Sequence, residues 1–68
     1  MTFEEIKYLL NENSTIRIYN SNHDFYAEYD GHESIPECFD YAEVNDIFAD
    51  EVENFPYLRP AIGIELDF

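Results

Sequence analysis

The distribution of charge is the feature that most limits how this chain can fold. Sixteen Asp and Glu residues face three Lys and Arg residues, so the formal net charge is −13. No Lys or Arg occurs between Ile18 and Leu58, whereas eleven carboxylate residues do. Because few intramolecular ion pairs can offset this repulsion, we expect it to destabilise the compact state. A net charge of about 2–8 already keeps a small domain in solution, so the excess favours a role for the charge itself.

The length and the apolar content indicate one small folded domain. The 68 residues suffice for a single domain, which we assign to residues 1–68. Hydrophobic residues make up 46% of the chain and include six Phe and six Tyr. Each aromatic side chain can bury about 150–250 Å², so a few of them can anchor a core, and we do not expect low-complexity disorder.

The spacing of apolar residues predicts an α+β fold. Thr2 and Glu5 match the capping-box pattern that begins a helix. The apolar residues that follow recur at helical spacing and predict an amphipathic helix over residues 2–12; they are Phe3, Ile6, Leu9 and Leu10. We expect this helix to pack on a small antiparallel sheet of three or four strands.

Alternating runs predict the strands of this sheet. Residues 15–20 and 25–31 alternate on either side of a turn-rich SNHD segment, which predicts a β-hairpin. Residues 61–68 alternate most regularly, with four apolar side chains on one face: Ile62, Ile64, Leu66 and Phe68. The first three should be buried beneath the helix face formed by Phe3, Ile6 and Leu10.

The middle of the chain fits two structures. As a second helix, residues 40–54 would begin at a capping box formed by Asp40 and Glu43. As a strand, the same segment would place Ile47 and Ala49 on one face. Local pattern alone leaves both alternatives open.

A series of short motifs favours the strand. I-P-E, an apolar pair, E-V, I-x-A and a closing I-x-I-E occur here at Ile35, Pro36, Glu37, Phe39, Glu43, Val44, Ile47, Ala49, Ile62, Ile64 and Glu65. In this order of motifs the chain resembles small uncharacterised acidic proteins of phages and integrated elements of Gram-positive bacteria. The resemblance implies a helix followed by a small antiparallel sheet, with residues 43–49 as a strand, and it implies no activity. The segment DEVENFPYLRPA departs from the pattern as a longer connection before the last strand.

Residues with catalytic or metal-binding side chains form no established pattern. His23, His32 and Cys38 have neither the number nor the spacing of zinc ligands. We expect Cys38 to be a buried structural residue and both histidines to be exposed in turns. A chain of this size also leaves little room for a substrate cleft, so we predict no enzyme activity, no cofactor and no bound metal.

The sequence predicts a location in the cytoplasm of a bacterial host cell. A single cysteine forms no internal disulfide and indicates a reducing compartment. The N-terminal MTFEEIKYLL has no basic leader, and no apolar run is long enough to span a bilayer. An acidic chain would also be repelled by anionic lipid surfaces, so we expect no membrane contact.

The charge argues against direct binding of nucleic acid, because affinity for DNA depends on neutralising phosphates with Lys and Arg. It suits a partner that itself binds nucleic acid. Carboxylates two apart on a strand lie about 6.6 Å apart, and those three or four apart on a helix lie about 5–6 Å apart. DNA carries a charge about every 3.4 Å per strand, so residues 43–53 could form a row of charges at roughly phosphate-like intervals in either structure. We therefore hypothesise a nucleic-acid mimic that occupies the basic groove of a host protein, such as a defence nuclease, by competition without catalysis.

Two groups of residues are predicted to make the phosphate-like contacts. The first comprises Glu43, Asp46, Asp50, Glu51 and Glu53, and the second comprises Asp24, Glu28, Asp30 and Glu33. The alternative function is a non-mimic interaction module, such as a homo-oligomer that pairs an exposed sheet edge. The simplest alternative is a solvated acidic surface that only maintains solubility.

Overall fold

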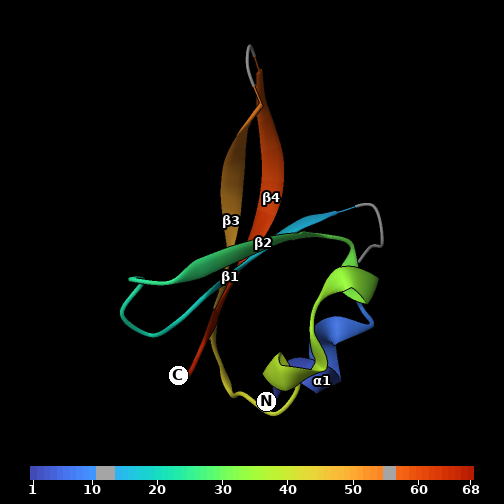
Figure 1. The fold of residues 1–68 in the computed structure, drawn as a ribbon, viewed down its shortest axis with the longest axis vertical. Coiled ribbons are helices and arrows are strands. Elements are labelled where there is room, and N and C mark those ends of the chain that lie inside the picture. Colours follow the sequence, from blue (N-terminus) through green and yellow to red (C-terminus); the bar gives the residue numbers. More distant parts are fainter. Residues whose placement is uncertain (11–13, 55–56) are drawn as a thin grey trace.

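The computed structural model describes residues 1–10, 14–54 and 57–68, without the side chains of residues 53 and 54. Its elements in chain order are α1 (Phe3–Lys7), β1 (Thr15–Tyr19), β2 (Tyr26–Asp30), the 3-10 turns η1 (His32–Ser34) and η2 (Glu37–Phe39), β3 (Val44–Asn54) and β4 (Tyr57–Leu66). The four strands form one sheet in the order β2-β1-β4-β3. Figure 1 shows α1 gathered with the segment between β2 and β3 at one side of this sheet. The fold is broadly α+β, with only a short helix.

The sheet is mixed, so the prediction of an antiparallel sheet is wrong. β1 pairs with β2, and β3 pairs with β4, in the antiparallel direction. The central strands β1 and β4 run parallel, with Ile16 opposite Ile62 and Ile18 opposite Ile64. A turn determines the direction of strands within a hairpin, but nothing local determines how one hairpin lies against another. Here β1 and β4, which supply most of the fully buried side chains, lie beside each other in the parallel direction.

Residues 40–54 contain a strand, and the alternative second helix is wrong. β3 pairs Ile47 with Ile64 and Ala49 with Ile62, so these two β3 residues share a face as the strand alternative predicted. The resemblance to phage proteins had favoured this alternative.

The segment DEVENFPYLRPA is also corrected, because it is part of a hairpin and not a connection. Pairing continues from Asp50 with Ala61 outward to Asn54 with Tyr57, and Figure 1 shows this arm of β3 and β4 extending beyond the other strands. Pro60 fits within β4 because β1 pairs only from Ala61 onward, so β3 is the one described strand that neighbours β4 there.

Helix α1 is shorter than the predicted helix over residues 2–12. Thr2 is its N-cap, and the Thr2 backbone N–H donates to Glu5 Oε1 at 3.4 Å, in agreement with the predicted capping box. Beyond Lys7 the Leu9 N–H bonds to the carbonyl three residues earlier, which tightens the chain into a turn. Leu9 is consequently 82% exposed, so the prediction that it lies on the apolar face of the helix is wrong. Residues 11 and 12 lie outside the described residues.

The core occupies one face of the sheet. Its members come from α1, β1, β4 and the segment after η1, and they are Phe3, Ile6, Ile16, Ile18, Ile35, Ile64 and Leu66. The predicted packing of Ile64 and Leu66 with Phe3 and Ile6 is therefore confirmed. Ile62 and Leu10 pack against this cluster but are only partly buried, because they lie towards its margin.

A buried ion pair joins α1 to the segment between β2 and β3. Lys7 Nζ lies 3.0 Å from Asp40 Oδ1, and the two side chains are 6% and 13% exposed. The ammonium also donates to the carbonyl oxygen of Ile35 at 3.3 Å. Since an unpaired buried charge is costly, this pair holds the short helix in place.

Candidate functional site

In the described part of the chain, the sheet face opposite the core is covered by no helix. Paired residues on neighbouring strands point to the same face, so the register defines its membership. Arg17 lies opposite Glu28 on β2 and opposite Gly63 on β4, and Gly63 lies opposite Phe48 on β3. We call this surface the open face; its charged and aromatic members on these four strands include Arg17, Tyr19, Tyr26, Glu28, Asp30, Asp46, Phe48, Asp50, Arg59 and Glu65.

A β-bulge decides that Asp46 belongs to the open face. Val44 pairs with Leu66 on the core side, whereas Asp46 pairs with Glu65, and the register shifts between these two pairs. Strict alternation would put Val44 and Asp46 on one face. The extra residue, Asn45, reverses this relationship and places Asp46 on the same face as Asp50.

The first predicted acidic group does not form one row. Asp46 and Asp50 lie on the open face, whereas alternation along β3 directs Glu51 to the opposite side. Glu43 precedes the strand, and its Oε2 lies 2.8 Å from the N-terminal amine. The side chain of Glu53 lies outside the described residues.

The second predicted group is divided in the same way. Glu28 and Asp30 project from β2 onto the open face, whereas Asp24 bonds to the Asn20 side chain in the β1–β2 turn. Glu33 is exposed in η1. The structure thus brings together two residues of each predicted group, and β4 adds a fifth carboxylate that we did not select, Glu65. The sequence could have indicated Glu65, because this residue lies on the polar side of the last alternating strand.

Arg17 occupies the middle of the open face. Its Nε lies 3.8 Å from Glu28 Oε1, and its Nη1 lies 3.7 Å from Asp50 Oδ2. Nη1 also donates to the carbonyl oxygen of Glu51 at 3.1 Å, and the guanidinium lies 4.4 Å from the centroid of the Tyr26 ring. Arg17 thus extends from β1 across β4 to Asp50 and Glu51 on β3.

Gly63 also creates the space for an aromatic ring. A Cβ atom at Gly63 would lie 2.3 Å from Cε2 of Phe48, which is far inside van der Waals contact. The Phe48 ring therefore lies against the backbone of β4 at Gly63. Its centroid lies 5.5 Å from that of Tyr19 and 6.1 Å from that of His23, so the rings form a cluster beside Arg17.

Hydrogen bonding keeps Asp50 charged within this cluster. Burial by itself would raise the pKa of Asp50, but the Tyr19 hydroxyl, the Glu51 N–H and the charge of Arg17 outweigh it, and the pKa lies below the ordinary value of 3.8. Burial, followed by the hydrogen bond to Asp50, raises the pKa of Tyr19 above 10.0. At neutral pH the pair therefore consists of a carboxylate and a neutral phenol.

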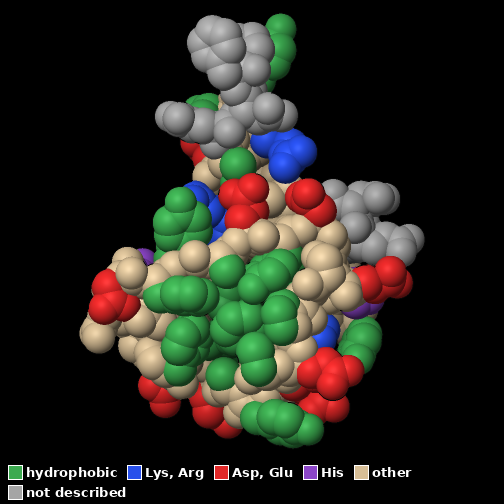
Figure 2. Space-filling view, viewed as in Figure 1, with side chains coloured by type: hydrophobic (Ala, Val, Ile, Leu, Met, Phe, Trp, Pro, Cys, Tyr) green, Lys and Arg blue, Asp and Glu red, His purple; other side chains and the backbone are tan. Residues whose placement is uncertain are grey.

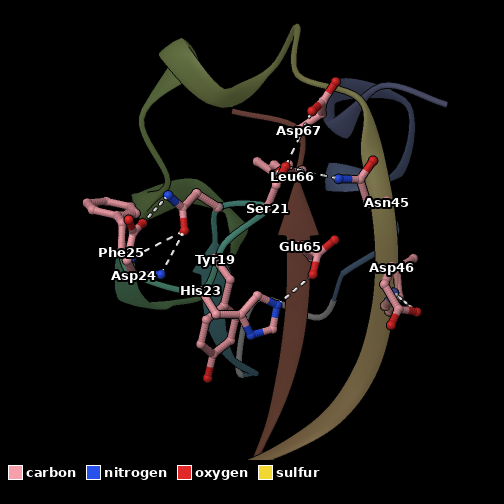
Figure 3. Close-up of polar contacts among 12 residues, drawn as sticks. Tyr19, Ser21, His23, Asp24, Phe25, Asn45, Asp46, Glu65, Leu66 and Asp67 are labelled. Carbon is pink, nitrogen blue, oxygen red and sulfur yellow. Dashed lines mark hydrogen bonds and ion pairs between the residues drawn. The ribbon is translucent and has the colours of Figure 1, made fainter.

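Polar contacts connect the β1–β2 turn to β3 and β4 (Figure 3). His23, with a φ of 57°, places its Nε2 2.6 Å from Glu65 Oε1, and its ring stacks on Tyr19 at a centroid distance of 4.9 Å. The Asn45 amide donates to the hydroxyl of Ser21 at 3.3 Å. These contacts from β3 and β4 fix the margin of the open face.

The open face retains an excess of negative charge. Five carboxylates share it with Arg17 and Arg59, which leaves a formal excess of three negative charges. Arg59 Nη2 lies 3.6 Å from Asp30 Oδ1. A surface with aromatic residues near its centre and carboxylates around them has the composition of a protein interface, in which rings provide contact area and charges steer the encounter.

The remaining candidate residues do not gather into a second site. Cys38 is exposed, so the prediction that it is buried is wrong. Its neighbour Phe39 packs against the core instead. His23 is exposed in a turn as predicted, whereas His32 is half-buried, with Nδ1 3.1 Å from the Leu10 carbonyl oxygen. The described residues contain no cluster of three or more His, Cys, Asp or Glu side chains that could hold a metal.

Among the residues described, no helix has the length and apolar character needed to cross a membrane. Comparison with known proteins adds no relative to this picture. No protein-family model, no curated protein and no solved structure matches the chain.

Proposed function

We propose that this protein is a non-catalytic inhibitor whose open face occupies the basic nucleic-acid-binding surface of a protein partner. The observation that supports the proposal is the gathering of five carboxylates from three strands on one uncovered face. The three cations of the chain should repel a basic partner only weakly, because each lies close to a carboxylate of the same chain. They are Lys7, Arg17 and Arg59.

The arrangement differs from the single row of charges that we hypothesised from the sequence. Glu28 and Asp30 are two apart on β2 and so lie about 6.6 Å apart, and neighbouring strands lie about 4.8 Å apart. The carboxylates therefore form a two-dimensional array and not a copy of one phosphate strand. Such an array can engage several Lys and Arg side chains of a groove at once, and this is sufficient to exclude nucleic acid by competition.

The net charge of −13 contributes to the proposed inhibition through the rate of encounter. A negative protein is attracted to the same basic surface that attracts nucleic acid, and such steering raises association rates in a salt-dependent way. The same field would repel nucleic acid from the inhibitor itself. Association with the partner should therefore weaken as the salt concentration rises.

A long sheet edge supports the alternative of an interaction module that pairs strands. β3 has eleven residues and lies at the edge of the sheet, with β4 as its one neighbour among the described strands. Unpaired backbone groups along an edge can bind another strand. Asp46, Asp50 and Glu51 on this edge oppose pairing with a second copy, because like charges would meet. A partner held by strand pairing should remain bound at high salt, unlike one held by the open face.

Competition with nucleic acid tests the proposed function. The immobilised protein would be incubated with bacterial lysate at low salt and then eluted with duplex DNA or RNA, or with polyglutamate at equal charge concentration. We expect nucleic-acid-binding proteins to elute with nucleic acid and not with polyglutamate. Captured proteins that nucleic acid leaves on the resin, or that polyglutamate removes equally well, would contradict the proposal.

Two matched variants locate the contact. The first neutralises open-face residues as E28Q/D30N/D46N/E65Q, and the second neutralises exposed acids elsewhere as E4Q/E33Q/E37Q/E51Q. Each changes the formal net charge from −13 to −9 by removing four carboxylates. The first should lose the captured proteins and the second should retain them, with circular dichroism confirming that both fold. Equal losses from both variants would show that total charge alone governs binding.

A further inference from the structure

A chain of four aromatic rings forms a separate surface on the core side of the sheet. Ring centroids lie 6.3 Å apart for Tyr29 and Phe39, 5.8 Å for Phe39 and Phe68, and 5.6 Å for Phe68 and Phe25. Tyr29 and Phe39 are half-buried and pack against the core, whereas Phe25 and Phe68 are 41% and 51% exposed. We call these four residues the aromatic patch.

Figure 2 shows hydrophobic side chains gathered in one area. In the same view of Figure 1, this area lies between β2, η2 and the C-terminus. Carboxylates lie around the margins of this area in the same view. Asp24 and Asp67, which precede Phe25 and Phe68 in the sequence, are exposed. The surface is therefore apolar in the middle and negative at its border.

The rings are held in place by the backbone around them. The side-chain oxygen of Asn20 accepts hydrogen bonds from the N–H groups of Asp24 at 3.1 Å and Phe25 at 3.2 Å. The Ser21 N–H donates to the carbonyl oxygen of Phe68 at 3.3 Å. A surface that is ordered in the free protein loses less entropy when it binds, so these contacts favour binding at the patch.

We propose that the aromatic patch binds an amphipathic, basic segment of a protein partner. Apolar side chains of that segment would cover the four rings, and Lys or Arg on its flanks would meet the bordering carboxylates. A neutral apolar segment would instead bury the bordering carboxylates without partners, which is costly. A second copy of this chain is disfavoured because each copy carries a net charge of −13.

The size of the patch also requires the basic flanks. A stable interface covers about 800 Å² on each partner, which is about a sixth of the 4567 Å² surface of this protein. Four partly buried rings cannot supply that area alone, so the surrounding carboxylates must take part. The β1–β2 turn contributes to both surfaces, with His23 at the open face and Phe25 at the patch. Binding at the patch does not require that the open face compete with nucleic acid.

Designed peptides test this inference without knowledge of the natural partner. The probe is a Leu–Lys peptide of about 18 residues, with Leu at helical i, i+3, i+4 spacing. One control has the same composition in scrambled order, and the other replaces Lys with Glu. At about 0.15 M salt the probe should bind at least about ten-fold more tightly than either control. NMR shift changes should centre on Phe25, Tyr29, Phe39 and Phe68.

A matched pair of variants separates the patch from general apolar contact. F25S/F68S should weaken probe binding about ten-fold or more, whereas Y8S/L9S should change it less than about two-fold, although Tyr8 and Leu9 are 69% and 82% exposed. If F25S/F68S does not fold, the ring resonances of the unmodified protein provide the same test. The inference is overturned if the probe fails to bind, if the scrambled peptide binds equally well, or if the shift changes centre on the open face. A dimer that F25S/F68S dissociates would likewise overturn it, because the occupant would be a second copy.

Discussion

Replacing Lys7 with Met should destabilise the protein severely although the substitution removes no apolar contact. Met is similar in length and adapts to irregular packing. The change leaves the Asp40 carboxylate, which is 13% exposed, without its cation. It also leaves the Ile35 carbonyl oxygen without the Lys7 donor. The cost therefore comes from an uncompensated buried charge.

The expected magnitude follows from the burial of this pair. Removing one partner of a buried ion pair costs about 3–5 kcal/mol, and the partial access of Asp40 to water places the value near the lower end, at about 3 kcal/mol. A chain of 68 residues has a total stability of about 3–10 kcal/mol. Its unfolding entropy is about 0.14 kcal/mol/K from the per-residue average, so the melting temperature should fall by about 20 °C.

Thermal and urea unfolding followed by circular dichroism would measure this loss. The control is the double variant K7M/D40L, which removes both charges and should recover most of the lost stability, because a buried ion pair can be replaced by apolar residues at little cost. A fall in melting temperature below about 5 °C for K7M, or no recovery in the double variant, would refute the reasoning.

Four further outcomes can be measured on the same samples. Leu66→Ala should cost about 2–5 kcal/mol because Leu66 is fully buried; an unchanged urea midpoint would show that β4 does not supply this core contact. Gly63→Ala should cost about 1–3 kcal/mol by displacing the Phe48 ring, and a similar cost in a Phe48→Ala background would refute that cause. Because the pKa of Asp50 is lowered in the folded state, its ionisation stabilises the protein above the ordinary value of 3.8, and this contribution is lost as the pH falls through the folded value. The stability difference between the parent and Asp50→Asn should therefore be constant above about pH 5 and shrink below about pH 4; a difference that persists unchanged to about pH 2 would contradict this. Finally, the melting temperature should rise from low to moderate salt as the Debye length falls to about 8 Å, and a flat or falling curve would mean that local ion pairs already compensate the net charge.

Local patterns in the sequence were sufficient for the elements that depend on neighbouring residues. The capping pair of Thr2 and Glu5 located the start of α1, and alternation on either side of a polar turn located the β1–β2 hairpin. Alternation in the last strand identified Ile64 and Leu66 as core residues. Each of these features is governed by interactions over a few residues along the chain.

Features that depend on distant contacts could not be derived in this way. Periodicity over residues 40–54 allowed a helix, and only pairing with β4 makes the segment a strand. The hairpin over residues 50–61 was missed for a different reason, because its paired residues lie close together in the sequence. Residues 57–60 are exposed and do not alternate between apolar and polar side chains, so the segment resembled a connection. The early end of α1 accompanies the bond from Lys7 to Asp40, which lies 33 residues away in the sequence.

The sequence by itself determined that the protein is strongly acidic, that its cations are few, and which side chains alternate along each strand. Only the tertiary structure decided which carboxylates share a surface. One extra residue at the bulge moves Asp46 to the open face, and the parallel pairing of β1 with β4 lets Arg17 meet Asp50 across β4. Charge is a property of composition, whereas the field at a surface depends on register, and register is set by the burial of the opposite face.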